Sequence, residues 1–392
     1  MAKRSVAKVD VAGKRVFLRV DFNVPLKDRT IADDTRIRAS LPTVQDLLRR
    51  GARLVIASHL GRPKGQPTAA ASLAPAARRL SELIGQPVAL APATIGPDVA
   101  AMVDALQPGQ ALMIENLRFD SGEEKNDPQF AAALASLADL YVDDAFGAAH
   151  RSHASVVGVA ERLPAYAGYL LLREADVLQR LLDHPVRPFV AVVGGAKVSD
   201  KLAVLEHLLE RVNGLLIGGG MANTFLLARG FEIGASLAER DLANKATAFM
   251  DRATALGVDL QLPVDVVVAP SIDAMSGQIM TVDAIPADEA VFDIGPATVT
   301  VFAKVIAGAG TVFWNGPMGV FERPAFAAGT RGVAEAVAAC AGFTVVGGGE
   351  SVAAVEQAGL AARIDHLSTG GGASLELLEG RILPGLAAIP DA

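Results

Sequence analysis

Two lysines follow a pair of glycines near the middle of the chain, directly after a short apolar run. The run Phe189–Val193 is rich in β-branched residues and predicts a buried strand, which Gly194 and Gly195 end. Lys197 and Lys201 are spaced i,i+4, so they would share one face of a helix. A strand, a glycine turn and a helix N-terminus with lysines favour phosphate, because free N–H groups and the helix dipole attract anions. The alternative is an ordinary turn with two solvated lysines.

Three further glycine-rich segments, at residues 218–223, 347–351 and 370–374, support a nucleotide site in this half of the chain. Glycine lets a ligand approach the backbone closely and leaves N–H groups free for phosphates. The pattern is not the common P-loop, since no glycine directly precedes a Lys-Ser/Thr pair, and no G-x-G-x-x-G fingerprint occurs. Residues 315–322 follow another predicted strand and place Glu322 near the same edge, where its carboxylate could accept ribose hydroxyls.

In the first half, polar segments follow apolar strands or lie between them, at residues 20–25, 34–38, 58–63, 115–119 and 149–155. Because the carboxyl ends of parallel strands meet at one edge of a sheet, we expect these segments to converge. Together they supply Arg36, Arg62, Arg118, Arg151 and His59. Arginine forks match phosphate and carboxylate oxygens, so the natural ligand is a small, multiply charged anion. Each arginine alone could instead form a surface ion pair.

Two pairs of acids or histidines in this half admit other interpretations. His150 and His153 are spaced like metal ligands, but Arg151 between them would oppose a cation and no cysteine lies near. Asp143 and Asp144 end a predicted strand and could form a Mg²⁺ site or an acid–base pair. We favour hydrogen bonding by these aspartates that positions the neighbouring basic loop.

Short apolar runs alternate with longer amphipathic runs, which predicts βαβ units and mainly parallel sheets covered on both faces. Strands are expected at 15–20, 53–58, 87–90, 111–115 and 140–144, and then at 188–193, 214–217, 265–269, 291–294, 311–314 and 343–346. The amphipathic stretch 169–182, ended by Pro185 and Pro188, predicts a helix between two domains. We place the first domain at residues 1–168, the interdomain helix at 169–185, and the start of the second domain at 186.

The composition describes a globular chain of 392 residues, 51% hydrophobic and 20% charged, with a formal net charge of −7. This length favours two domains. The negative charge makes a nucleic-acid-binding or acidic-membrane-binding surface unexpected. Cys340 is the single cysteine, so an internal disulfide is not expected, and no signal peptide or membrane-spanning run is evident. We therefore expect a cytoplasmic protein.

In its motifs the chain resembles the phosphoglycerate kinase family over nearly its whole length. Residues 19–25, 58–63, 115–119 and 150–155 look like that family's opening signature and substrate loops. Residues 194–201, 218–222, 314–322, 347–351 and 368–375 look like its nucleotide side. The resemblance implies two Rossmann-like, three-layer α/β domains joined by a helix, and a monomer. It also implies a 3-phosphoglycerate-binding domain at 1–168, a nucleotide-binding domain at 186–380, and a tail at 381–392 that returns to the first domain.

The resemblance implies roles for individual residues as well. Those that would hold 3-phosphoglycerate are Asp21, Phe22, Asn23, Arg36, His59, Leu60, Gly61, Arg62, Arg118 and Arg151. Those that would hold ATP or ADP are Gly195, Ala196, Lys201, Gly219, Asn315, Pro317, Glu322, Gly348, Gly349, Glu350 and Ser351. Those that would surround the transferring phosphoryl group are Arg36, Lys197, Gly371 and Gly372. Glu350 departs from the Asp expected at that position, but its carboxylate offers the same oxygen ligand to nucleotide-bound Mg²⁺.

The implied reaction is the reversible glycolytic phosphoryl transfer between ATP and the carboxylate of 3-phosphoglycerate, giving ADP and 1,3-bisphosphoglycerate, with domain closure. A carboxylate has a pKa of roughly 3–4, so it is ionised near neutrality and needs no general base. Two other functions stay open on the residues alone. Another α/β small-molecule kinase would need a base beside an alcohol acceptor. A non-catalytic, two-lobed anion-binding protein would leave the glycine segments and Lys197 unexplained.

Overall fold

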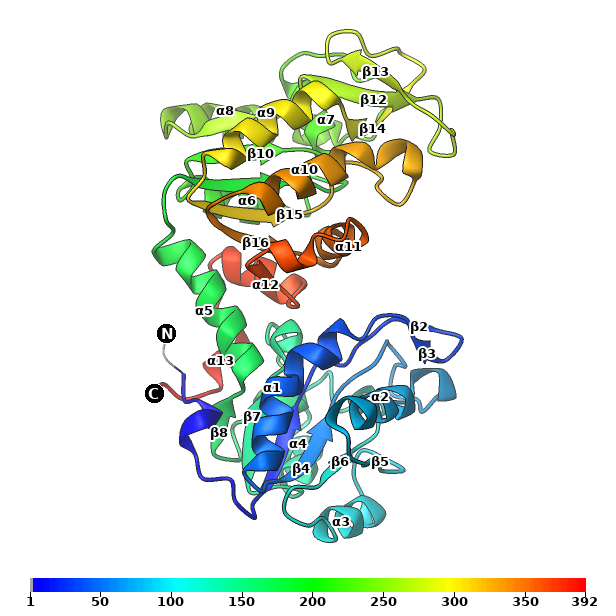
Figure 1. Cartoon of the computed structure of the whole chain (residues 1–392), viewed down its shortest axis with the longest axis vertical. Coiled ribbons are helices and arrows are strands. Elements are labelled where there is room, and N and C mark those ends of the chain that lie inside the picture. The colour runs from blue at the N-terminus through cyan, green and yellow to red at the C-terminus, as the bar shows by residue number, and fades with distance from the viewer. Residues whose placement is uncertain (1–2) are drawn as a thin grey trace. The chain divides into compact units, whose positions relative to one another are not determined.

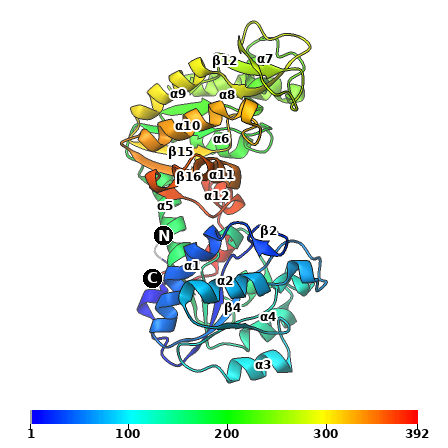
Figure 2. The same cartoon turned by 45° about the vertical axis from the view of Figure 1, so that its right-hand side comes forward.

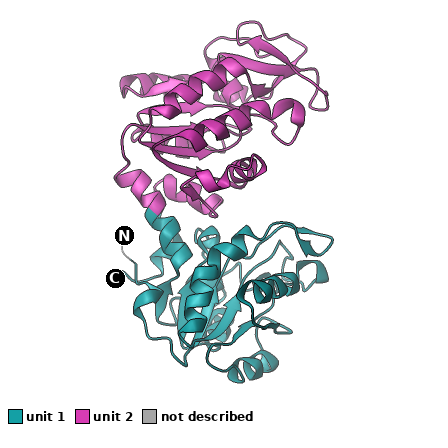
Figure 3. Cartoon of the chain, in the orientation of Figure 1, with its two compact units in different colours: residues 1–176, 382–392 teal, residues 177–381 magenta. Residues whose placement is uncertain are grey.

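The computed structural model describes residues 3–392 and divides the chain into two compact units (Figure 3). Unit 1 runs from the start of the described chain to Asp176 and also includes Ile382–Ala392, and unit 2 is Val177–Arg381. Helix α5 (Tyr169–Asp183) connects them along the chain. Among residues 3–392, no helix combines the length and the apolar character needed to cross a bilayer.

Unit 1 is built on a six-stranded sheet whose neighbouring strands are all parallel. In chain order the strands are β1 (Arg15–Arg19), β4 (Arg53–Ala57), β5 (Val88–Leu90), β6 (Ala111–Met113), β7 (Leu140–Asp143) and β8 (Ala165–Ala167). Across the sheet the order is β5-β6-β4-β1-β7-β8, so the winding changes direction between β1 and β7. In open α/β sheets, ligands bind outside the carboxyl ends of the strands at such a switch. A separate hairpin joins β2 (Leu26–Lys27) to β3 (Thr30–Ile31).

Helices cover both faces of this sheet (Figures 1 and 2). They are α1 (Thr35–Arg49), α2 (Ala74–Ile84), α3 (Pro97–Asp104) and α4 (Pro128–Ala135). Side chains along each strand alternate between two cores, as the pleat of an extended strand requires. Leu54 and Ile56 of β4 join the core that contains α1 and α2, whereas Val55 and Ala57 join the core that contains α3 and α4.

The last residues of the chain pack on unit 1. Helix α13 (Pro384–Ala387) contacts the turn at Ala154–Gly158. Close to the two ends of the chain, Lys3 Nζ forms an ion pair with Asp391 (2.8 Å). The first and last described segments therefore lie side by side in this unit (Figure 1).

Unit 2 repeats the plan with a second six-stranded parallel sheet, ordered β11-β10-β9-β15-β16-β17. Its strands are β9 (Phe189–Val193), β10 (Gly214–Ile217), β11 (Asp259–Gln261), β15 (Thr311–Asn315), β16 (Phe343–Gly347) and β17 (His366–Leu367). Its helices are α6 (Leu202–Leu209), α7 (Met221–Ala228), α8 (Ala243–Ala255), α9 (Pro296–Ala307), α10 (Ala328–Ala339), α11 (Gly349–Gln357) and α12 (Gly372–Leu378). The winding changes direction between β9 and β15, so their carboxyl ends border the crevice of this sheet.

The two α/β units with mainly parallel sheets confirm the predicted fold class, with one local difference. The expected strands at 265–269 and 291–294 form, but outside the parallel sheet: β12 (Asp265–Ala269) and β14 (Ala290–Ile294) pair antiparallel, and β12 also pairs with β13 (Gln278–Thr281). The sequence analysis missed β13, which is mostly exposed, and the edge strands β8, β11 and β17, which have three residues or fewer. Such short segments bury too little apolar surface to produce a readable pattern.

Candidate functional site

An acid–base cluster lies just beyond the carboxyl end of β1 in unit 1. Arg36 Nη1 donates to Asp21 Oδ2 (2.5 Å), and His59 Nδ1 lies 3.8 Å from Asp21 Oδ1. The three residues come from the loop after β1, the first turn of α1 and the loop after β4. Burial alone would raise the pKa of the Asp21 carboxyl, but the surrounding charges, Arg36 included, outweigh burial and lower the pKa. Asp21 is therefore an anion that orients Arg36.

Arg19, the last residue of β1, is fully buried and fixes the His59 ring. Its Nη2 lies 3.1 Å from His59 Nδ1, its Nε donates to Ser155 Oγ (2.8 Å), and its Nη1 donates to the Val20 carbonyl. A guanidinium cannot accept a hydrogen bond, so His59 Nδ1 must accept and the neutral ring carries its proton on Nε2. Burial, assisted by the nearby arginine charges, lowers the pKa of His59 well below its usual range. His59 is therefore a neutral N–H donor near neutral pH.

A buried carboxylate completes the surroundings of Arg19. Ser155 Oγ donates to Glu123 Oε1 (2.6 Å), and Ser155 N–H donates to Glu123 Oε2 (3.0 Å). Burial raises the pKa of Glu123, and the charge of Arg19 and the bonds from Ser155 oppose that rise. His153 Nδ1 lies 3.7 Å from Glu123 Oε1, and burial lowers the pKa of His153 to about 3. His153 is thus a neutral neighbour of this buried group and not a further cation.

Hydrogen bonds tie the loop after β4 to its neighbours. Gly61 N–H donates to Asn23 Oδ1 (2.9 Å), and Arg118 Nη1 donates to the Gly61 carbonyl (2.6 Å). Asn116 Nδ2 donates to the Leu60 carbonyl (2.7 Å). The loops after β1, β4 and β6 therefore hold one another at the edge of the sheet. This convergence was predicted from the placement of polar segments after the strands.

The remaining residues predicted for this site lie at different depths. Phe22 is buried, and its N–H donates to Ser58 Oγ (2.8 Å). Burial lowers the pKa of Arg118, and the nearby charge of half-buried Arg151 adds to that effect. Arg62 is exposed and has no hydrogen-bond or ion-pair partner among residues 3–392, so only its place next to Gly61 in the chain links it to the cluster. The edge as a whole presents arginines around a neutral histidine, which suits an anion.

A second network joins the carboxyl ends of β15 and β16 in unit 2. Lys201 Nζ donates to Asn315 Oδ1, and Asn315 Nδ2 donates to the Gly347 carbonyl (2.8 Å). Gly316 N–H donates to Ser351 Oγ (2.5 Å), which is fully buried in the first turn of α11. Burial lowers the pKa of Lys201, and nearby carboxylates oppose this shift. Three of the residues predicted for nucleotide binding thus lie in one connected set that includes a half-buried lysine.

A cavity of about 510 Å³ in unit 2 has the size and chemistry for a nucleotide. The predicted residues among its lining are Gly195, Ala196, Gly219, Pro317, Glu322 and Glu350. Its other walls include the apolar side chains of Leu237, Phe292 and Val320. Gly219 has φ +66°, and a Cβ there would lie 2.7 Å from the Gly195 nitrogen, so only glycine fits. Apolar walls can hold the nucleobase of a nucleotide, and glycine backbone N–H groups can bind its phosphates.

Lys197 lies in an exposed loop before α6, so the prediction that it shares a helix face with Lys201 was wrong. Helix α6 begins at Leu202, and Lys201 is only its N-cap residue. The intervening loop is held at Ser199, whose N–H donates to Glu239 Oε2 (2.9 Å). Spacing alone could not reveal this, because the same i,i+4 separation occurs in a turn.

The glycine segments at 347–351 and 370–374 end at helix N-termini. Gly348 and Gly371 are the N-cap residues of α11 and α12, and both have positive φ (91° and 51°). Gly349 and Gly372 are the first residues of these helices and are exposed. The first N–H groups of a helix have no intrahelical acceptor, so they can donate to an anion.

The aspartates at the end of β7 bond to backbone groups. Asp143 Oδ1 accepts from Ala145 N–H (2.9 Å), and Asp144 Oδ1 accepts from Leu170 N–H (2.9 Å) in the first turn of α5. Asp144 therefore caps a helix. The prediction that it positions the basic loop was wrong. Burial raises the pKa of Asp143 to about 6 and the pKa of Asp144 to about 8.

The sequence analysis placed Arg19 and Ser155 inside motif segments but gave them no role of their own, and it missed Glu123. An arginine at the end of an otherwise apolar strand was the available signal, because a buried charge requires partners. Leu237 and Phe292 were also missed, and no signal marks them, since their apolar side chains are ordinary for this chain. These residues support the predicted ones and do not replace them.

Two α/β units, one with an arginine-rich edge and the other with a nucleotide-sized cavity beside a lysine, are typical of a two-domain phosphotransferase. A sequence profile described as phosphoglycerate kinase matches residues 6–381. The phosphoglycerate kinase of Thermomicrobium roseum is 58% identical over 389 residues, which cover 99% of both chains. That of Roseiflexus castenholzii is 54% identical over 395 residues, covering 100% of both. The chain belongs to the phosphoglycerate kinase family.

Solved structures agree with this assignment. Phosphoglycerate kinase from Coxiella burnetii superimposes with a TM-score of 0.89 at 44% identity, covering 98% of both chains. The enzyme from Pyrococcus horikoshii OT3 superimposes with a TM-score of 0.86 at 34% identity over the same share. The activity of the chain is accordingly that of a phosphoglycerate kinase, a phosphotransferase.

Replacing Arg19 tests the buried network. Arg19→Met removes the donor to His59 Nδ1 and leaves Glu123 without its buried counter-charge. We expect the free energy of unfolding to fall by about 3 kcal/mol. We also expect His59 to lose its fixed Nε2–H tautomer, which ¹⁵N NMR of the imidazole ring reports directly.

Arg15→Met is the matched control, because Arg15 lies on the same strand but pairs with Asp139 in a solvent-accessible position (2.8 Å). Its loss should cost less than about 1 kcal/mol and leave the His59 spectrum unchanged. Identical His59 spectra in the two variants would contradict the role given to Arg19.

Replacing Asp144 tests the pH dependence. Its folded pKa of about 8 exceeds the unfolded value of about 3.9, so the folded chain retains a proton that the unfolded chain releases. Stability from this group is therefore complete at low pH and is lost as pH rises toward 8. Asp144→Asn keeps the oxygen that accepts from Leu170 but does not titrate. In urea unfolding, the variant should lose less stability than the wild type between about pH 5 and about pH 8.

Asp139→Asn is the control for this experiment. Burial alone would raise the pKa of Asp139, but the bonds from Arg15 outweigh burial and lower the pKa, so this group titrates below the window tested. Its replacement should leave the wild-type slope in place. The assignment fails if Asp144→Asn also keeps that slope.

Proposed function

We propose that the cluster in unit 1 binds phosphoglycerate and that the cavity and network in unit 2 bind ATP or ADP. The first set is Asp21, Phe22, Asn23, Arg36, His59, Leu60, Gly61, Arg62, Arg118 and Arg151. The second set is Gly195, Ala196, Lys201, Gly219, Asn315, Pro317, Glu322, Gly348, Gly349, Glu350 and Ser351. The observation that carries the first assignment is the contact between Arg19 Nη2 and His59 Nδ1 (3.1 Å), from which we infer a neutral Nε2–H donor among arginines. Such an edge can hold both a phosphate and a carboxylate without a base.

The chemistry needs positioning and charge neutralisation more than proton transfer. The acceptor carboxylate is ionised near neutrality, since its pKa is roughly 3–4. Arg36 is oriented by Asp21 (2.5 Å), so its guanidinium is available to the carboxylate and to the equatorial oxygens of the transferring group. Lys197 is exposed on a loop, and the N–H groups at Gly371 and Gly372 face no intrahelical acceptor. We assign these groups to the phosphoryl group in transfer.

We further propose that Mg²⁺ accompanies the nucleotide. Among residues 3–392, no group of three or more His, Cys, Asp or Glu side chains could hold a metal alone. Mg²⁺ commonly binds through phosphates with one or two carboxylates, and Glu350 supplies one carboxylate on the cavity wall. The residues therefore fit a metal that arrives with the nucleotide. When bound, Mg²⁺ neutralises charge on the phosphate oxygens.

The proposed ligands bind to different units, so transfer requires that the units bring them together. We propose that phosphoglycerate and nucleotide together favour a closed form, which excludes water from the reacting groups. Small-angle X-ray scattering should then show a smaller radius of gyration with both ligands than with neither. An unchanged radius would count against closure. The same measurement gives the mass in solution, for which we propose a monomer, acting in the cytoplasm without nucleic acid or membrane.

Two substitutions test the catalytic assignments. We expect Arg36→Ala and Lys197→Ala each to lower kcat by ~10²-fold or more, because each removes a positive side chain that would neutralise the oxygens of the transferring phosphoryl group. A coupled assay of ADP formation with 3-phosphoglycerate measures the effect, and circular dichroism checks the fold.

The matched controls are Arg38→Ala, on the same helix and paired with Asp34 (2.8 Å), and Lys304→Ala, on α9. Both should retain nearly wild-type kcat. Normal turnover of Arg36→Ala or Lys197→Ala would contradict the role given to that residue. It would not contradict the phosphoglycerate kinase activity of the wild-type chain.

A further inference from the structure

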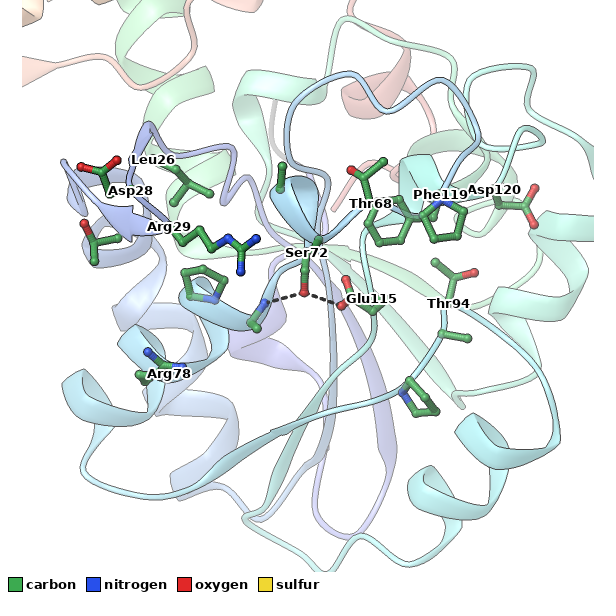
Figure 4. A pocket seen from close by; sticks show the side chains of 18 residues that line it. Leu26, Asp28, Arg29, Thr68, Ser72, Arg78, Thr94, Glu115, Phe119 and Asp120 are labelled. Atoms are coloured by element: carbon green, nitrogen blue, oxygen red, sulfur yellow. Dashed lines mark hydrogen bonds between the residues drawn. The ribbon is translucent and has the colours of Figure 1, made fainter.

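Unit 1 has a cavity of about 810 Å³ at the carboxyl ends of β5 and β6 (Figure 4). Its walls come from the β2–β3 hairpin, the segment that leads into α2, and the loops after β5 and β6. None of the residues assigned above to phosphoglycerate, nucleotide or the transferring group lines it. The volume falls within the roughly 300–1,000 Å³ of small-molecule sites. The carboxyl edge of a parallel sheet is also where such sites occur.

Two of the three acidic residues that line this cavity are already satisfied, and the third, Asp28, is exposed at the tip of the hairpin. Glu115 Oε1 accepts from Ser72 Oγ (2.6 Å), and Glu115 Oε2 accepts from Asn116 N–H (2.9 Å) and from a second backbone N–H. Asp120 Oδ1 accepts from Gly122 N–H (2.7 Å). These carboxylates therefore stabilise the surrounding loops, and they do not create a demand for a cationic ligand.

Both arginines that line the cavity are exposed to solvent and differ from their neighbours in lacking a protein partner within the described chain. Arg29 and Arg78 both line it, and neither has a hydrogen-bond or ion-pair partner among residues 3–392. Their neighbours Arg38 and Arg79 differ, because each pairs with Asp34 at 2.8 Å. Arg29 and Arg78 also line an adjoining cavity of about 540 Å³, so they lie at the boundary between the two cavities. Unpaired guanidiniums beside a cavity favour an anionic ligand.

The backbone at Arg29 adds an independent observation. Asp28 and Arg29 form the tip of the hairpin, and both have left-handed φ values (50° and 62°). Glycine is preferred at such turn positions, and another residue there costs roughly 1 kcal/mol or more. Figure 4 shows the Arg29 side chain extending into the cavity toward Ser72, with Phe119 and Thr94 across from it. The strained turn therefore directs a guanidinium into the cavity.

We propose that this cavity binds a small organic carboxylate with an apolar or aromatic body. Arg29 and Arg78 hold the carboxylate, since a guanidinium fork matches its two oxygens. Leu26, Pro75 and Phe119 supply apolar surface for the body of the ligand. A fully polar anion would leave that surface without a partner. The site is separate from the proposed phosphoglycerate site and does not depend on its assignment.

The test uses 4-(trifluoromethyl)benzoate as the probe, titrated into the full chain and followed by ¹⁹F NMR. We expect one saturable site in the wild type. Arg29→Gly and Arg78→Gln should each weaken binding by ~10-fold or more, because each removes a charge-assisted hydrogen bond. Glycine adopts the φ of position 29 without strain, so a loss of binding in Arg29→Gly cannot be attributed to a damaged fold.

Arg62→Gln is the matched control. Arg62 is also exposed and unpaired in the described chain, but it belongs to the proposed phosphoglycerate site of unit 1. Retained binding in Arg62→Gln together with weakened binding in the other two variants supports the proposal. Three outcomes overturn it: no saturable binding to the wild type, equal affinity in all the variants, or a loss confined to Arg62→Gln.

Discussion

The guanidinium of Arg19 is the interaction on which the arginine-rich edge of unit 1 depends. A charge removed from water costs several kcal/mol unless hydrogen bonds and a counter-charge surround it. Arg19 has them only when three segments far apart in the chain meet: its own strand, the loop that carries His59, and the turn that carries Ser155. The less buried arginines of this edge, Arg36, Arg62 and Arg151, need no such set of partners. The burial of Arg19 thus fixes the positions of the loops that carry the other charged residues of this edge.

The two units present different anion-binding groups at equivalent places in their sheets. In both, the candidate site lies where the winding of a parallel sheet changes direction, between β1 and β7 and between β9 and β15. Unit 1 presents arginine side chains there, which suit a compact anion with two charged ends. Unit 2 presents glycines and helix N-termini, where backbone N–H groups can follow an extended polyphosphate. Asn315 supports that arrangement by joining Lys201 to the backbone of β16.

Most of the fold, and the way the residues of each candidate site come together, could be predicted from the sequence, because polar or glycine-rich segments directly follow apolar runs. Asp21, Arg36 and His59 were predicted together for this reason, and they do meet. Arg19 was not predicted, since its burial depends on Ser155, which lies 136 residues away and carries no mark of its own. Lys197 was misplaced on a helix because spacing does not report where a helix begins. The antiparallel pairing of β12 was unpredictable for a related reason: an apolar run shows that a strand is buried but not which strand lies beside it.

The ion pair between Lys3 and Asp391, together with α13, has a consequence for synthesis of the chain. Unit 2 is continuous in sequence, whereas unit 1 is completed by residues that follow unit 2. On the ribosome, unit 2 therefore emerges with all its parts while unit 1 still lacks the segment that covers Ala154–Gly158. That turn includes Ser155, the partner of Arg19. The segment that follows unit 2 in the chain thus packs on the turn that holds the buried charge of the first strand.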